Sequence, residues 1–156
     1  MSKKRVVITG MGIVSPIGND LDEFWKNLKV GHNGIDQISS FDTTKFDVKI
    51  AGESNIDLVS FFDRKELNKL DRFTAFALVA AEQAITQSNI NNKNSLSSRI
   101  GVIVGSGIGG IGTFESQHKK LLKNPRYVSP FFIPSMISDI AAGQISIKYG
   151  FKGINY

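Results

Sequence analysis

The residues that most suggest chemistry are the glycines of a short turn, Gly105–Gly110, which reads GSGIGG. An apolar run, RIGVIV, leads into this turn, and a predicted helix follows it. The spacing is G-x-G-x-x-G between a strand and a helix, as in turns whose backbone approaches the pyrophosphate of a dinucleotide. A nucleotide-binding module is therefore one hypothesis that the sequence raises.

The sequence after the turn does not supply the rest of a dinucleotide site. Such a site needs a second strand that ends in an acidic residue, which holds the ribose. The predicted helix leads instead into KNPRYVSPFFIPS, which holds three prolines and no apolar run ending in an acid. The earlier glycines Gly10 and Gly12 are followed by Pro16 and Gly18, and neither turn precedes a G-K-[S/T] phosphate loop. We therefore expect the glycines to permit positive φ and close backbone packing.

Other side chains with catalytic or metal-binding chemistry are few. The sequence contains no cysteine, which excludes disulfides, thiolate metal ligands and a cysteine nucleophile among these residues. Its two histidines are His32, in a glycine-rich turn, and His118, predicted on an exposed helix face. We expect no metal site and no catalytic role for either histidine.

Composition narrows the classes of partner. The net charge is +5, from 19 basic and 14 acidic side chains, which weakly favours an acidic partner. The basic residues are scattered, with modest clusters at 64–69 and 119–126, so we expect no nucleic-acid binding. No apolar run approaches the roughly 20 residues of a membrane span, and the N-terminal apolar run is too short for a signal peptide. These features predict a cytoplasmic protein that is not inserted in a membrane.

Apolar runs and helix signals alternate along the chain. Asn19 or Asp20 is predicted to cap a helix over 21–28, and Glu23 lies three residues after Asp20, as in a capping box; Asp71 is predicted to cap a largely buried helix that ends near Ser88. The other predicted helices are 64–70, 111–122 and 134–150, the last with Gly150 as its predicted C-cap. The predicted strands are 5–9, 100–104 and an edge strand near 46–51, and 89–98 is predicted to be a polar loop. Strands separated by helices favour an α/β layer with a buried, mostly parallel sheet.

Four motifs follow one another in the order of a known family. They are RVVITGMGIVSPIGND, followed by a tryptophan-containing helix and GHNGI; KELNKLDRFTAFALVAAEQAI; RIGVIVGSGIGG; and VSPFFIPSMISDIAAGQISIKYGFKG. This order resembles the β-ketoacyl-acyl carrier protein synthases, and most closely the type II synthases of bacterial fatty acid synthesis. The resemblance implies an α/β thiolase-like fold, of which residues 1–156 form an incomplete N-terminal half, that is, a partial N-terminal β-ketoacyl synthase domain. It further implies a homodimer and no cofactor.

The resemblance also implies a reaction, the decarboxylative Claisen condensation. An acyl chain passes from its carrier protein to a cysteine at a helix N-terminus, and malonyl-carrier protein then extends it. In the family a segment like GFKGINY, at residues 150–156, leads to that cysteine within a handful of residues, and Ile154 stands where proline is usual. His32 and His118 match neither of the family's two catalytic histidines. We expect a synthase II truncated before its cysteine, with no catalytic residue and no activity on its own.

Some binding residues carry over by position in the family motifs. Ile108 matches a residue that gates the acyl pocket, and Phe132, within Phe131–Ile133, matches a segment near the dimer interface that helps line the partner's acyl tunnel. Lys65, Lys69 and Arg126 match basic positions that contact the acidic carrier protein, whereas Asn68 replaces a frequent arginine. Two alternatives stay open: a non-catalytic fragment that binds carrier protein or dimerises, and the nucleotide-binding module.

Overall fold

The computed structural model describes residues 4–90 and 96–156. In chain order its elements are α1 (Leu21–Lys29), β1 (Ile35–Gln37), β2 (Ile50–Gly52), η1 (Leu58–Ser60), α2 (Arg64–Leu67), α3 (Arg72–Ser88), η2 (Ser97–Arg99), α4 (Ile111–Lys123), η3 (Pro125–Tyr127), α5 (Phe132–Met136) and α6 (Ile140–Tyr149). None of the helices within the described ranges combines the length and apolarity needed to cross a bilayer.

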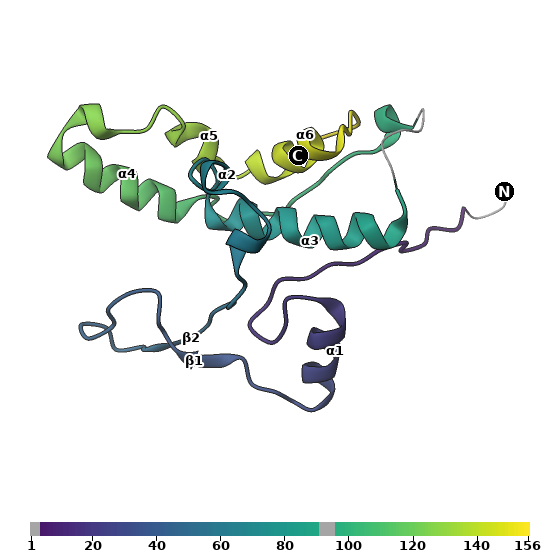
Figure 1. The fold of residues 1–156 in the computed structure, drawn as a ribbon, viewed down its shortest axis with the longest axis horizontal. Coiled ribbons are helices and arrows are strands. Elements are labelled where there is room, and N and C mark those ends of the chain that lie inside the picture. Colours follow the sequence, from purple (N-terminus) through teal and green to yellow (C-terminus); the bar gives the residue numbers. More distant parts are fainter. Residues whose placement is uncertain (1–3, 91–95) are drawn as a thin grey trace.

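The core lies between α3 and α6, which run side by side in the upper part of Figure 1. Val79 and Leu78 of α3 and Ile145 of α6 are buried there, with Phe62 beside them. Lys148 of α6 bonds Glu82 of α3 at 2.7 Å, at the edge of this contact. The long helix is less buried than predicted, since Thr74, Ala75, Leu78 and Val79 are buried and most of its other residues are half-buried; its N-cap is Asp71 as expected.

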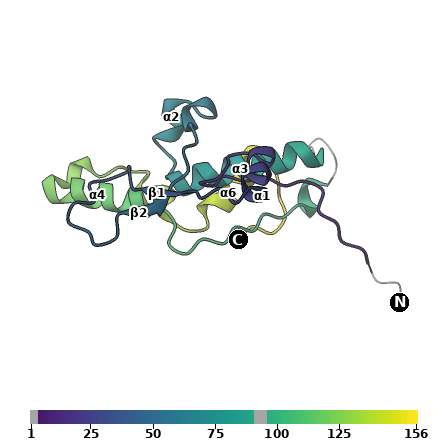
Figure 2. The ribbon, with the colours of Figure 1, turned by 90° about the horizontal axis from the view of Figure 1, so that it is seen from below.

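The other helices are arranged around this pair. In Figures 1 and 2, α4 and α5 project to one side of α3, while α1 and the β1–β2 hairpin lie below it in Figure 1. The predicted cap of α1 is confirmed, because Asp20 accepts a hydrogen bond from the Glu23 N–H at 2.9 Å. The Glu23 carboxylate accepts in turn from the N–H of Asn19. The helix predicted at 64–70 is shorter than expected and ends at Leu67.

The strand predictions need the largest corrections. Residues 5–9 pair with no other described segment, so the strand predicted there is not formed, and Val6 is 94% and Ile8 82% exposed. A ladder needs a neighbouring strand, and none of the described residues supplies one. The edge strand predicted near 46–51 is β2, which pairs antiparallel with β1, a strand that was not predicted.

The second predicted strand, 100–104, finds a partner that the sequence did not indicate. Val102 donates its N–H to the Ile154 carbonyl at 2.8 Å, and Val104 donates to the Tyr156 carbonyl at 2.9 Å. This is a short parallel pairing, of which only the Val102–Asn155 bridge is regular. The expected mostly parallel sheet is therefore reduced to one bridge, and Ile103 is 78% exposed rather than buried.

The helix predicted over 134–150 is two helices. The chain leaves α5 at Ile137, whose backbone is extended, and re-enters a helix at Ile140. The break has a physical cause, since the carbonyl of Met136 accepts a hydrogen bond from Gly110 at 2.8 Å instead of continuing the helix. The predicted C-cap at Gly150 is confirmed, with φ of 68°. The end of the predicted loop 89–98 overlaps η2, and its residues 91–95 lie outside the described part of the chain.

Candidate functional site

The glycine turn connects an extended segment to a helix, as the sequence indicates. Its N-terminal side is held by the pairing of Val104 with Tyr156, and its C-terminal side opens α4 at Ile111. Within the turn the hydroxyl of Ser106 accepts the N–H of Gly109 at 3.0 Å. Ile108 stands at its apex with 70% of its side chain exposed. The turn therefore presents one isoleucine outward between two fixed ends.

The last two glycines of the turn are required by close packing. Gly109 has φ of 77°, and a Cβ there would overlap the carbonyl oxygen of Met136. A Cβ on Gly110 would lie 2.6 Å from the carbonyl oxygen of Ser135 and 2.9 Å from Oδ2 of Asp71. The expected positive φ is therefore confirmed at Gly109 and the expected close packing at Gly109 and Gly110, whereas Gly105 and Gly107 show neither.

Asp71 bonds to two helices at once. Its Oδ1 accepts the N–H of Phe73, in the first turn of α3, at 3.2 Å. Its Oδ2 accepts the N–H of Thr113, in the first turn of α4, at 2.8 Å. The side chain is buried. Sequence reasoning found the α3 cap from the Asp-Arg-Phe start of the helix but missed the bond to α4, because the two residues are 42 positions apart.

Ser135 of α5 contributes to a contact point at which four helices meet, α2, α3, α4 and α5. It is buried, and its hydroxyl donates to the Lys69 carbonyl at 2.7 Å. We use the term helix junction for the segments that meet here, which are Lys69–Asp71, Gly109–Thr113 and Ser135–Met136. The helix junction joins the end of the α2 segment to the starts of α3 and α4 and the end of α5.

The predicted carrier-binding lysines lie on and just after α2. Asp63 and Glu66 form a capping box there. The Asp63 carboxylate accepts a hydrogen bond from the Glu66 N–H at 2.8 Å, and the Glu66 carboxylate accepts one from the Asp63 N–H at 3.0 Å. Lys65 is exposed on this helix, and the Nζ of Lys69 lies 5.6 Å from the ring centroid of Phe131. The structure therefore places both lysines together on one exposed segment.

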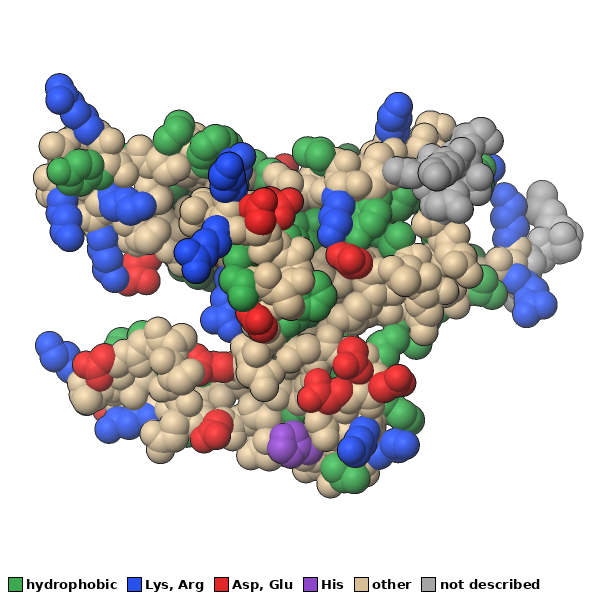
Figure 3. All heavy atoms as spheres, in the orientation of Figure 1, with side chains coloured by type: hydrophobic (Ala, Val, Ile, Leu, Met, Phe, Trp, Pro, Cys, Tyr) green, Lys and Arg blue, Asp and Glu red, His purple; other side chains and the backbone are tan. Residues whose placement is uncertain are grey.

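Arg126 lies apart from these lysines. It belongs to η3, which follows the C-terminal end of α4. The first turn of this 13-residue helix lies in the helix junction, at the opposite end from Arg126. At about 1.5 Å per residue that helix is roughly 20 Å long. Blue side chains line the end of the molecule formed by α4 in Figure 3. The lysines of α4 itself are Lys119, Lys120 and Lys123.

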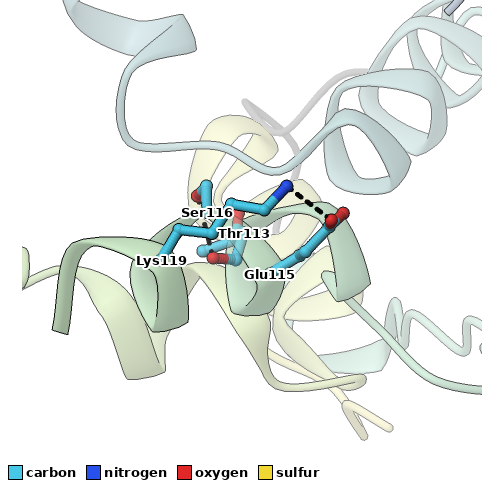
Figure 4. A network of polar contacts seen from close by, with 4 residues as sticks. All are labelled: Thr113, Glu115, Ser116 and Lys119. Carbon is cyan, nitrogen blue, oxygen red and sulfur yellow. Dashed lines mark hydrogen bonds and ion pairs between the residues drawn. The ribbon is translucent and has the colours of Figure 1, made fainter. Parts of the chain in front are cut away.

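The polar contacts of α4 on this surface are local (Figure 4). Lys119 Nζ bonds Glu115 at 2.7 Å, and Ser116 donates its hydroxyl to the Thr113 carbonyl at 2.9 Å. The hydrogen bond from Lys119 lowers the pKa of Glu115. Both members of the ion pair are about two-thirds exposed, so the pair leaves this surface open to a partner.

Phe132 packs against α4 and not at the apex of the turn. Its ring lies 6.2 Å from that of Phe114, which stacks on the exposed ring of His118 at 6.2 Å. A hollow of about 250 Å³ lies beside Phe132, between α2 and α4, with Asn68, Gln117 and Lys120 in its wall. The expected exposure of His118 is confirmed. The structure thus brings Phe132 to the same hollow as Asn68, while Ile108 lies on the glycine turn.

Comparison with known proteins identifies the family. Residues 3–156 match the sequence profile of the β-ketoacyl synthase N-terminal domain. The chain belongs to the β-ketoacyl synthase family. After α4 the chain continues through η3, α5 and α6, and residues 154–156, which then pair parallel with Val102 and Val104, include no acidic residue to hold a ribose. Both observations stand against the nucleotide-binding hypothesis.

Relatives with curated names share the sequence over nearly its whole length. The chain is 51% identical to the 3-oxoacyl-[acyl-carrier-protein] synthase 2 of Staphylococcus aureus strain N315, over 97% of this chain and 37% of that protein. It is 43% identical to the protein of the same name from Vibrio cholerae, over 99% of this chain and 38% of that protein. This β-ketoacyl synthase chain therefore spans somewhat over a third of the length of the curated relatives that it matches.

Solved ketosynthase structures share the fold. A β-ketoacyl synthase from Burkholderia phymatum superposes with a TM-score of 0.78 at 26% identity, over 97% of this chain and 38% of that one. The ishigamide ketosynthase/chain length factor superposes with a TM-score of 0.81 at 20% identity, over 99% of this chain and 40% of that one. A type II polyketide ketosynthase in complex with its acyl-carrier protein gives 0.71 at 25% identity, over 96% and 40%. The predicted α/β, thiolase-like fold class is confirmed, as an incomplete part of such a domain.

Proposed function

We propose that this chain supplies the N-terminal part of a type II 3-oxoacyl-[acyl carrier protein] synthase, an acyltransferase of fatty acid synthesis. The observation that carries the proposal is the 51% identity to a named synthase over 97% of the chain. In the reaction a cysteine thiolate takes the acyl group from its carrier thioester and releases the carrier thiol. Malonyl-carrier protein then loses CO₂, and the resulting carbanion attacks the acyl-cysteine, which forms 3-oxoacyl-carrier protein and frees the cysteine.

The roles proposed for this chain are to line the acyl pocket and to bind the carrier protein. Ile108 and Phe132 are the proposed pocket residues, one presented by the glycine turn and one packed on α4. Lys65, Lys69 and Arg126 are the proposed carrier-binding residues, and their exposure and positive charge support this. The sequence contains no cysteine, so the nucleophile is not among these residues. We propose a homodimeric, cytoplasmic synthase that uses no cofactor.

A chimeric enzyme tests the proposed reaction. Residues 1–156 of this chain replace the matching segment of the S. aureus relative, which keeps its own remaining sequence; this protein is called the chimera below. We expect the chimera to elongate acyl-carrier protein with malonyl-carrier protein, and its cysteine-to-alanine variant to be inactive. A folded chimera without activity on any acyl chain length would contradict the proposal. The 156-residue chain alone is expected to form no condensation product.

Charge reversal tests the carrier-binding residues. Replacing Lys65 and Lys69 by glutamate in the chimera is expected to weaken carrier binding about tenfold at low salt, because these charges steer an acidic partner. The matched control reverses Lys26 and Lys29 on α1, which lies away from α2 (Figure 1). Asn68→Arg adds a cation between the two lysines and is expected to strengthen binding. Equal affinity of both double variants and the unmodified chimera would remove the lysines from the interface.

A second function, carrier binding without catalysis, is favoured by one observation: Lys65 on α2 and Lys69 just after it are exposed in a chain that has no cysteine. Binding of acyl-carrier protein by the 156-residue chain alone, weakened by the same double reversal, would support it. Binding that appears only in the chimera would leave the synthase role as the single function.

A further inference from the structure

We propose that Asp71 is a positioning residue for the acyl pocket, which fixes the glycine turn and therefore the place of Ile108. Asp71 lies at the start of α3, and it holds the turn through its hydrogen bond to Thr113 in the first turn of α4. The inference rests on the proposed function in one respect, the assignment of Ile108 to the pocket wall.

The first argument is the sharing of one buried carboxylate between two helix starts. Oδ1 bonds the Phe73 N–H at 3.2 Å and Oδ2 bonds the Thr113 N–H at 2.8 Å. Free N–H groups at a helix start carry partial positive charge, and α3 and α4 both direct theirs at this carboxylate. Gly110, the residue that precedes α4, has no side chain with which to cap it. Asp71 therefore supplies from α3 the cap that the sequence of the turn does not give to α4.

The second argument is the lack of space for any other arrangement. Gly110 is buried, and an added Cβ would meet Asp71 on one side and the Ser135 carbonyl on the other. The N–H of Gly110 is fixed to the Met136 carbonyl at 2.8 Å. The C-terminal end of the glycine turn is therefore held between the Asp71 carboxylate and α5.

The third argument is that the rest of the turn has few contacts of its own. Added Cβ atoms on Gly105 and Gly107 would meet nothing within 4 Å, and the side chain of Ile108 is largely exposed. The direction in which Ile108 points is thus set at the ends of the turn. Asp71 controls the end nearer to Ile108, two residues away at Gly110.

Two substitutions of Asp71 separate its two bonds. Asp71→Asn keeps one acceptor oxygen and places an NH₂ group where an N–H already points, so one of the two bonds is lost. Asp71→Ser keeps a short acceptor that caps α3 but does not reach Thr113 on α4. The control is Asp63→Ser, which alters a cap that serves α2 only.

Hydrogen exchange in the chimera tests the contact without requiring activity. We expect Asp71→Ser to speed amide exchange across 109–114 about 2- to 30-fold, the range for loss of a helix cap, with a smaller change at 73–76. Asp63→Ser should change exchange only near α2. Unchanged exchange at 109–114 in both Asp71 variants would overturn the proposal.

Substrate length then tests whether Asp71 positions the pocket. Relative to the chimera, Asp71→Ser is expected to lower kcat/KM for long acyl chains about tenfold more than for short ones, and the effect should vanish when Ile108 is already alanine. An equal loss at all chain lengths would show a structural role only and overturn the positioning role. If the chimera itself is inactive, the proposed function fails, whereas the exchange experiment still decides whether Asp71 holds the turn.

Discussion

The helix junction and the extended segments of this chain differ in how far their contacts are completed. At the helix junction, Asp71, Gly110 and Ser135 are buried and bonded to one another's segments at 2.7–2.8 Å. In the extended segments the apolar side chains are open, with Val6 94%, Ile8 82% and Ile103 78% exposed. The polar groups of the helix junction are thus buried and hydrogen-bonded, whereas the extended segments leave apolar side chains exposed to solvent.

Of the two extended segments, only residues 100–104 have a packed side, and we call the opposite side, which carries Ile103, the open face; Val6, Val7 and Ile8 of the other segment are all exposed. Val102 and Val104 lie against the α3–α6 core, while Ile103 between them points away from it. Runs that are apolar on both faces are typical of strands covered on both sides. The chain exposes 11713 Å², whereas a compact 17.1 kDa monomer exposes roughly 7,800 Å². Since relatives are more than twice as long, we expect the rest of a synthase to cover this face.

The largest effect is expected from a charge on the open face. Ile103→Asp in the chimera should lower the unfolding free energy by about 4 kcal/mol or more. We expect the rest of the synthase to bury this position, and a buried, unpaired carboxylate is strongly disfavoured. The control is Ile147→Asp on α6, whose side chain is 75% exposed, close to the 78% of Ile103, but lies beside Lys69 and Lys148. It should change stability little. Equal denaturation midpoints for the two variants would show that the open face remains uncovered.

At the helix junction a single methyl group should have the next largest effect. Gly110→Ala in the chimera is expected to lower the unfolding free energy by about 3 kcal/mol, because Cβ would overlap the Ser135 carbonyl and force the backbone to move. Gly112→Ala, two residues on, is the control, since its Cβ would lie 3.7 Å from Asp71 in ordinary contact. Urea unfolding of both proteins measures the difference. Similar values would mean that the helix junction is loosely packed.

A smaller loss of stability is expected where the N-terminal segment meets α3. Gln83 of α3 accepts the Ile13 N–H at 2.9 Å and donates to the Asn19 carbonyl at 2.7 Å, which fastens the N-terminal segment to the core. Gln83→Ala should cost about 1–2 kcal/mol in the chimera, for two lost hydrogen bonds. Gln144→Ala on α6 provides the control. A Gln83 variant as stable as this control would mean that packing alone holds the segment.

The sequence predicts the helices well and the contacts between them poorly. Asp20, Asp71 and Gly150 each mark a helix end through local chemistry, and each is confirmed by the structure. The break at Ile137 and the bond from Asp71 to Thr113 depend on residues dozens of positions away, so periodicity could not indicate them. Residues 5–9 have the composition of a strand, but composition does not provide the neighbour that a strand needs. The proposed site residues come from the family resemblance, because exposed lysines and one isoleucine carry no distinctive local pattern.

The β1–β2 hairpin offers the smallest test and a contrast to both regions, because its fastening is polar and exposed. The hydroxyl of Ser40, the N–H of Ser39 and the hydroxyl of Ser39 hold the pKa of Glu53 at about 2, below the usual 4.5. A lowered pKa means that this carboxylate stabilises the fold fully above about pH 4.5 and loses its effect as pH falls toward 2. Glu53→Gln in the chimera should therefore lower Tm slightly at pH 7, and the difference from the unmodified chimera should shrink between pH 4.5 and pH 3. Asp47→Asn in the same hairpin is the control, and a Glu53 difference that stayed constant with pH would show that the serines do not hold the charged carboxylate.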